Sequence, residues 1–213
     1  MEIMVQGIGN GNFIPNEVSL NINFHVKSES YESVLELGVN NVQSFISEIL
    51  LKNGFTIDDM KTKSFVIREE KKYDESTRTY IFDGFSFNQS ANIKFDYNRE
   101  LVASIMSQIS SLDNAPTYNI SFGLSNLEDC KKQLLTMAYE DAMLKAQIIS
   151  DAAGKCLKRC IKVDFKPLNY EYVSETNLEG FMKADYVTNS IVNTFTPEDI
   201  ELSETLYCLW LAE

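Results

Sequence analysis

The chain has 213 residues, and 44% of them are hydrophobic, which is enough apolar material for a sizeable core. Its net charge of −12, with no run of more than two Lys or Arg, argues against nucleic-acid binding, because phosphate contacts need clustered cations. No apolar segment approaches the roughly 18 residues of a membrane helix, and the N-terminus lacks the features of a signal peptide. We therefore expect no membrane insertion and a cytoplasmic location, or export if a leader has been removed.

The N-terminal segment is rich in glycine, at Gly7, Gly9 and Gly11. A glycine-rich loop can bind phosphate when it opens a helix, but here Pro15 and a strand follow. The pattern predicts a turn or a bulged edge that joins two strands.

The clearest strand is predicted over residues 17–27. Its apolar and polar residues alternate strictly, so one face should be buried and the other exposed to solvent. His25 belongs to the polar set, and we expect a solvated side chain rather than a catalytic one. The apolar set is Val18, Leu20, Ile22, Phe24 and Val26.

A first helix is predicted over residues 31–52, with Ser30 as its N-cap and Asn53–Gly54 as its stop. Residues at helical spacing suggest its buried stripe. This stripe comprises Leu35, Val39, Val42, Ile46, Ile49 and Leu50.

Two long strands should follow around a hairpin at residues 74–77, with a bend in the second strand at Gly84. A second helix is predicted over residues 99–112, with Leu101, Ile105, Ile109 and Leu112 buried, and a further strand over residues 117–124. The third helix should begin with a capping box formed by Ser125 and Glu128 and end at Gly154.

The rest of the chain suggests a strand over residues 160–168 and a closing strand over residues 197–213. Residues 174–193 have no clear period and are expected to form a long excursion. The predicted order is ββαββαβαββ, an α+β fold with mainly antiparallel sheets and three helices. It forms either one domain over residues 1–213 or two subdomains, about 1–97 and 98–213.

The third helix contains an acid and a base on its apolar side, Asp141 and Lys145. They lie one turn apart, in the order that favours a helical ion pair. Small residues recur every fourth position, which predicts close packing on a sheet or another helix. We interpret the pair as a structural ion pair, mostly shielded from water, since a catalytic site needs a pocket and further reactive groups. The small residues are Ala138, Ala142, Ala146, Ser150 and Gly154.

The four cysteines are Cys130, Cys156, Cys160 and Cys208. Cys156 and Cys160 have a spacing that zinc sites use, but no second ligand pair accompanies them. We expect reduced structural thiols, no metal, no cofactor and no catalytic residue.

Five segments together resemble successive parts of the SIMPL-domain family, which is widespread in bacteria. The most specific is AYEDAMLKAQIISDAAG at residues 138–154. The resemblance implies an α+β fold, no established enzymatic activity, and links to stress defence and to self-assembly into rings. The other segments are VQGIGNGNFIPNEVSLNINF, MKTKSFVI, DGFSFNQSANIKF and TPEDIELSETLYCLWL.

Two functional hypotheses follow. The first is a non-enzymatic interaction protein that forms homo-oligomers, through free strand edges and terminal apolar residues such as Trp210 and Leu211. The second is a small-molecule-binding or hydrolytic protein that uses Asp141 and Lys145, since charged groups in apolar surroundings often mark functional sites.

Overall fold

The computed structural model describes residues 1–165 and 196–213. The elements follow the predicted order ββαββαβαββ, and the α+β class is confirmed. The excursion predicted at residues 174–193 lies outside the described residues. The chain separates into two compact units that interleave along the sequence: Met1–Asn16, Gly123–Ser174 and Pro197–Glu213 form unit 1, and Glu17–Phe122 and Glu175–Thr196 form unit 2.

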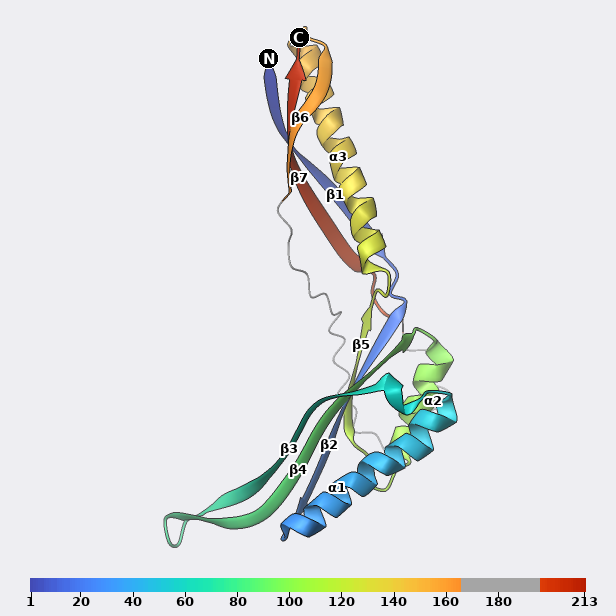
Figure 1. Ribbon diagram of the computed structural model, residues 1–213, viewed down its shortest axis with the longest axis vertical. Helices are drawn as coiled ribbons and strands as arrows, with labels where there is room; N and C mark the ends of the chain where they lie inside the picture. The colour runs from blue at the N-terminus through green and yellow to red at the C-terminus, as the bar shows by residue number, and fades with distance from the viewer. Residues whose placement is uncertain (166–195) are drawn as a thin grey trace. The chain divides into compact units, whose positions relative to one another are not determined.

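Unit 1 is a three-stranded antiparallel sheet with one long helix on one face (Figure 1). Its strands are β1 (Glu2–Phe13), β7 (Ile200–Ala212) and β6 (Leu157–Phe165), in that spatial order, and its helix is α3 (Leu127–Ala152). The apolar residues of β1 and β7 alternate, and one set packs under α3. This core contains Ile3, Val5, Ala138, Ala142, Ala146, Leu206, Cys208, Trp210 and Ala212.

The three N-terminal glycines do not form a turn or a bulge. They lie within β1, which pairs with β7 in unbroken register from Glu2 to Phe13. A Cβ atom at Gly7 would lie 1.9 Å from the carbonyl oxygen of Ala138. A Cβ atom at Gly9 would likewise lie 2.0 Å from the carbonyl oxygen of Leu134, so Gly7 and Gly9 let the backbone of α3 lie directly on the strand.

The small ridge predicted on the third helix is confirmed. The buried residues of α3 recur every four positions, and Gly154, with φ of 65°, follows the helix as predicted. The predicted capping box is wrong: the helix begins after Asn126, and the backbone N–H of Ser125 donates to the side chain of Asn16. The buried residues are Cys130, Leu134, Ala138, Ala142, Ala146 and Ser150.

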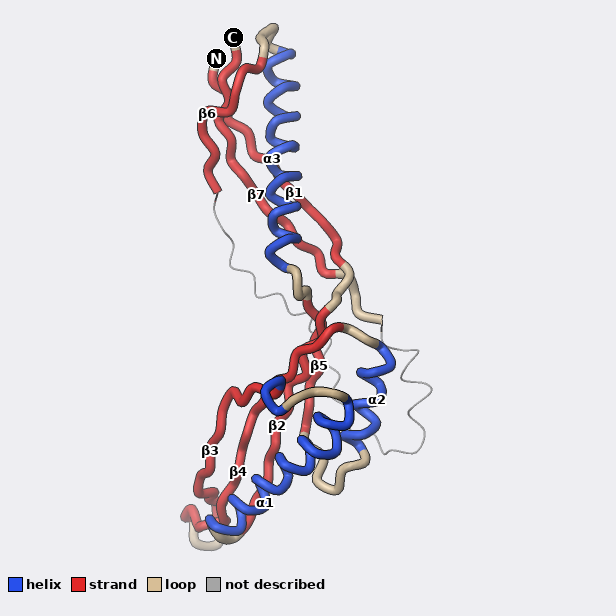
Figure 2. The backbone as a smooth tube through the Cα atoms, turned by 45° about the vertical axis from the view of Figure 1, so that its right-hand side comes forward, coloured by secondary structure: helices blue, strands red, loops and turns tan. Residues whose placement is uncertain are grey.

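Unit 2 is a four-stranded sheet in the order β3-β4-β2-β5, with two helices against one face (Figure 2). The core lies between that face and the helices. The elements are β2 (Glu17–Ser28), α1 (Tyr31–Phe45), β3 (Met60–Asp74), β4 (Thr79–Asp96), α2 (Arg99–Ser110) and β5 (Thr117–Gly123).

Strand β2 has the predicted alternation, with Val18, Leu20, Ile22 and Phe24 almost fully buried. Its other face is polar and exposed. There His25 shares a hydrogen bond with the side chain of Asn88 on β4, at 2.8 Å between nitrogen and oxygen.

The regular part of the first helix is shorter than predicted. The predicted stripe is wrong only in its first half, because Ile49 and Leu50 are buried and Val42 and Ile46 pack against the core. After α1 the chain continues as a π-helical turn (Ile46–Leu50) and a 3-10 turn (Leu51–Asn53), and Ser30 caps the start as predicted. Leu35 and Val39 are exposed, whereas Val34 and Gly38 are buried. A Cβ atom at Gly38 would lie 2.2 Å from the ring of Phe87, so this close approach sets which face meets the sheet.

None of the helices in the described part of the chain is long and apolar enough to span a membrane.

Candidate functional site: the Asp141–Lys145 pair and an aromatic arm

Asp141 and Lys145 form an ion pair on α3, with 2.6 Å between the ammonium nitrogen and Oδ2. Both side chains also bind the backbone of β1. Lys145 donates to the carbonyl oxygen of Gln6 at 3.0 Å, and the N–H of Ile8 donates to Asp141 at 2.8 Å. The pair therefore joins the helix to the strand at two successive hydrogen-bonding positions.

Strand β1 lies at the edge of its sheet, beside β7 only. In an antiparallel ladder, alternate residues turn their N–H and C=O groups away from the neighbouring strand. Gln6 and Ile8 are two residues apart, so Lys145 and Asp141 occupy groups that an added strand would use. The pair thus blocks strand addition along this part of the edge.

The pair is partly shielded from water. The side chains of Asp141 and Lys145 are 31% and 43% exposed, so more than half of each is covered, but neither is fully buried. The hydrogen bond from Lys145, together with that from the N–H of Ile8, lowers the pKa of Asp141 below its ordinary value. A lowered pKa keeps this carboxylate ionised and is the opposite of what a general acid near neutral pH requires.

The buried face of α3 around this pair is narrow. Ile148 and Ile149, one turn further along the helix, are 60% and 44% exposed. The small residues at every fourth position allow α3 to lie close to β1. The sheet therefore buries only this one row of helix residues.

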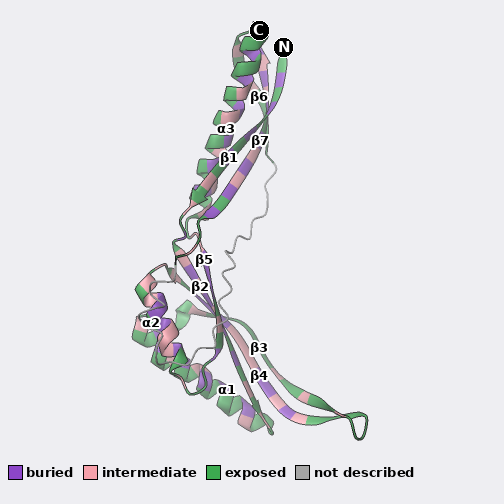
Figure 3. Cartoon of the chain, turned by 180° about the vertical axis from the view of Figure 1, so that it is seen from behind, coloured by how far each residue is buried: buried purple, intermediate pink, exposed green. Residues whose placement is uncertain are grey.

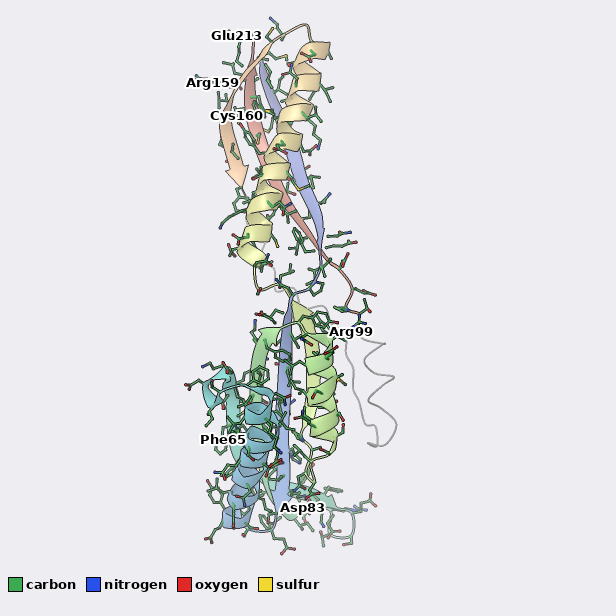
Figure 4. All side chains as sticks on the ribbon, turned by 90° about the vertical axis from the view of Figure 1, so that its right-hand side faces the viewer. Phe65, Asp83, Arg99, Arg159, Cys160 and Glu213 are labelled. Carbon is green, nitrogen blue, oxygen red and sulfur yellow. The ribbon has the colours of Figure 1, made fainter. Side chains whose placement is uncertain are left out.

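The cysteines lie in different environments. Cys130 and Cys208 are buried, Cys156 is exposed, and Cys160 lies on β6 with intermediate burial (Figure 4). Burial raises the pKa of Cys208 to about 11, with a further contribution from neighbouring Cys160. Across residues 1–165 and 196–213, no group of three or more His, Cys, Asp or Glu could hold a metal ion.

Trp210 does not lie on the surface, contrary to the hypothesis that terminal apolar residues serve as a docking site. It is only 4% exposed, and its ring lies 5.6 Å from that of Tyr139 on α3. Its position on the inner face of β7 makes it part of the core of unit 1.

The hairpin of β3 and β4 carries an exposed group of aromatic residues. Strand β2 ends opposite Phe85, so residues 71–83 extend as a ribbon of two strands, with no third strand beside them in the described part of the chain (Figure 1). We call this ribbon the aromatic arm. Within it, Tyr73, Tyr80 and Phe82 are 52%, 72% and 52% exposed, and the turn at residues 75–78 is exposed (Figure 3).

The aromatic side chains of the arm contact one another and its base. The rings of Tyr73 and Tyr80 lie 5.4 Å apart, as do those of Phe82 and Phe85, and Phe85 contacts Tyr31 of α1. Sequence reasoning predicted the hairpin but missed this surface. The sequence did contain a signal for this surface. Tyr80 and Phe82 precede Gly84 in β4, and no apolar segment was predicted to cover them.

The sequence was compared with known protein families and with curated proteins. A model of the family SIMPL, described as protein of unknown function (DUF541), matches residues 3–206. A search of curated proteins found no match.

Proposed function

The chain belongs to the SIMPL family, whose function is unknown, and we propose that it is a non-enzymatic protein that acts by binding further copies of itself. A role in stress defence is part of this proposal only through the family resemblance. The hydrolytic alternative has less support, because Asp141 and Lys145 are engaged with the backbone of β1.

The observation that carries the proposal is the exposure of the aromatic arm. Three large aromatic side chains, Tyr73, Tyr80 and Phe82, are each more than half exposed on a ribbon only two strands wide. Exposed apolar patches on soluble proteins mark interaction sites, and Tyr and Phe are enriched at the centres of interfaces.

The charge distribution favours a second copy as the occupant. The whole chain carries −12, so two copies repel each other over most of their surfaces. Within the aromatic arm, residues 71–83, however, three basic residues balance three acidic ones. Among the described residues, the arm therefore combines the most exposed aromatic side chain, Tyr80, with little net charge, which makes contact between two arms less unfavourable than contact between strongly acidic surfaces.

Light scattering over a micromolar concentration series tests the proposal. The unaltered chain should show a mass above the 24.3 kDa of one chain, increasing with concentration. The double variant Tyr80→Ser with Phe82→Ser should remain near the monomer mass. Tyr207→Ser is the matched control, because it removes a 46% exposed aromatic side chain from β7 and should leave assembly unchanged.

Two results would overturn the proposal. One is a monomer at every concentration of the unaltered chain. The other is an oligomer whose mass the double variant does not reduce, which would place the interface elsewhere.

A further inference from the structure

Unit 2 contains a cleft that the proposed assembly does not use. It has a volume of about 460 Å³ and lies between α1 with its π-helical continuation and the C-terminal end of α2. That volume is within the range of small-molecule sites. Neither Asp141 nor Lys145 lines it.

Asn41 is the one buried polar residue of the cleft lining. It is 7% exposed and lines the cleft from α1, on the face that packs toward the sheet. Its carboxamide is not fully enclosed by protein, so it is open to a ligand in the cleft. A ligand that supplies both a donor and an acceptor would bond both ends of this carboxamide.

The walls of the cleft are held in place before any ligand binds. The side chains of Asn53 and Gln108 exchange two hydrogen bonds, at 2.8 and 3.3 Å, and Gln108 also donates to Ser104. These bonds tie α2 to the end of the first helix. The π-helical turn supplies Glu48 and Ile49 to the lining, and π-helical turns are frequent at functional sites.

The lining defines the chemistry of the ligand. Lys52 is its one cation and is already paired with Glu48, whereas Asp113 adds a second carboxylate, so an anionic ligand would be repelled. The lining contains no aromatic ring on which a nucleobase could stack. It offers instead carboxamides and hydroxyls, from Asn40, Asn41, Ser44, Gln108, Ser111 and Asn114, beside the apolar Leu37, Ile49 and Leu112.

We propose that this cleft binds a neutral polyhydroxylated molecule, a mono- or disaccharide, with Asn41 as the buried hydrogen-bonding group. The asparagine carboxamides and the hydroxyl of Ser44 bond the hydroxyl groups, because Gln108 and Ser111 already donate within the protein. The three apolar side chains contact the C–H faces of the ring. In such a site a few polar groups fix the orientation of the ligand, and the apolar side chains contact the rest of its surface.

The test is an NMR titration of the full chain, observing backbone and side-chain amide resonances. The probes are glucose, N-acetylglucosamine, maltose and trehalose, with sodium phosphate as the anionic probe and spermidine as the cationic probe. At least one of the saccharides should shift the Asn41 side-chain resonances saturably at millimolar concentration. Phosphate and spermidine should not.

Matched variants locate the binding. Asn41→Leu should lower the affinity for the saccharide by about tenfold, the loss expected for one or two neutral hydrogen bonds. Gln43→Leu, two residues along the same helix and outside the lining, should bind normally. If Asn41→Leu does not fold, Asn114→Ala, an exposed lining residue, should weaken binding in its place.

Three outcomes would overturn the proposal: no saturable shift with any saccharide, shifts with phosphate or spermidine alone, or saccharide binding that neither Asn41→Leu nor Asn114→Ala weakens. The titration is independent of the assembly measurement, so each proposal can fail without the other.

Discussion

The carbonyl oxygen of Ala138 lies directly over Gly7, so close that a Cβ atom on this glycine would be 1.9 Å from it. Gly9 lies under the carbonyl oxygen of Leu134 in the same way, at 2.0 Å. β1 has glycines where it meets α3, and α3 has small side chains where it meets β1. The two elements can therefore pack closely. This contact brings Asp141 and Lys145 within reach of the β1 backbone.

Gly7→Ala should destabilise the protein strongly. The added methyl group meets the backbone of α3, which cannot move aside without separating from the sheet, so we expect a loss of about 3 kcal/mol in the free energy of unfolding. Gly11→Ala is the control, since its Cβ would meet only the side chains of Phe13 and Leu134, at 3.0 to 3.2 Å. Urea denaturation measures both. Equal stability of the two variants would contradict the close contact at Gly7.

The sequence predicted the elements well because their signals are local. The alternation in β2 and the φ > 0 stops at Gly54 and Gly154 depend on neighbouring residues alone. The roles of Gly7 and Gly38 depend instead on a helix carbonyl and a phenylalanine ring far along the chain, so local reasoning predicted a turn at the first and misplaced the buried face around the second. The interleaving of the two units has the same origin, since no local pattern reports which distant segments pack together.

The pair of Asp141 and Lys145 was found from the sequence, but its surroundings were not. Helical spacing places the two side chains together, and their contact requires only the helix. The hydrogen bonds to Gln6 and Ile8 require in addition the position of β1 under α3. The aromatic arm was missed for a related reason: its exposure results from β2 ending opposite Phe85, and strand lengths cannot be matched from sequence alone.

Glu204 on β7 should make stability depend on pH. It is 3% exposed, and its Oε2 has no hydrogen bond within the described residues. Burial raises the pKa of this carboxyl above its ordinary 4.5, with Lys131 opposing part of the effect. The folded state therefore holds the proton to higher pH than the unfolded state, so the contribution of Glu204 to stability falls as pH rises from 4.5 through the raised pKa.

Glu204→Gln removes this ionisation. Relative to the unaltered chain, its free energy of unfolding should improve steadily as pH is raised from about 4 to about 7. Glu201→Gln, an exposed neighbour on the same strand, should show no such trend. Guanidinium denaturation at several pH values provides the comparison. A difference between Glu204→Gln and the unaltered chain that does not change with pH would exclude a raised carboxyl pKa.

The thiols should react in order of their exposure. Cys156 is exposed and should react first with a disulfide reagent such as Ellman's reagent, whereas Cys208, buried and with a pKa of about 11, should react only on unfolding. Cys156→Ser should remove the fast phase, and Cys130→Ser should leave it. Simultaneous reaction of all four thiols would contradict this order. Stoichiometric zinc, or a mass lower by the two hydrogens of a disulfide, would contradict the prediction of free thiols.

The central claim is that Asp141 and Lys145 hold α3 on β1 rather than catalyse a reaction, and a double-mutant cycle in thermal and urea unfolding tests it most directly. Lys145→Met leaves Asp141 without its cation and should cost about 1–2 kcal/mol, less than the ~3–5 kcal/mol of a fully buried pair because both side chains are partly exposed. Asp141→Leu combined with Lys145→Met should recover part of that loss, since no charge is then unpaired. Lys132→Met, which breaks a far more exposed pair with Asp129 on the same helix, should change stability little. If Lys145→Met instead melts within about a degree of the unaltered chain, the pair does not secure the helix, and the structural account of this site is wrong.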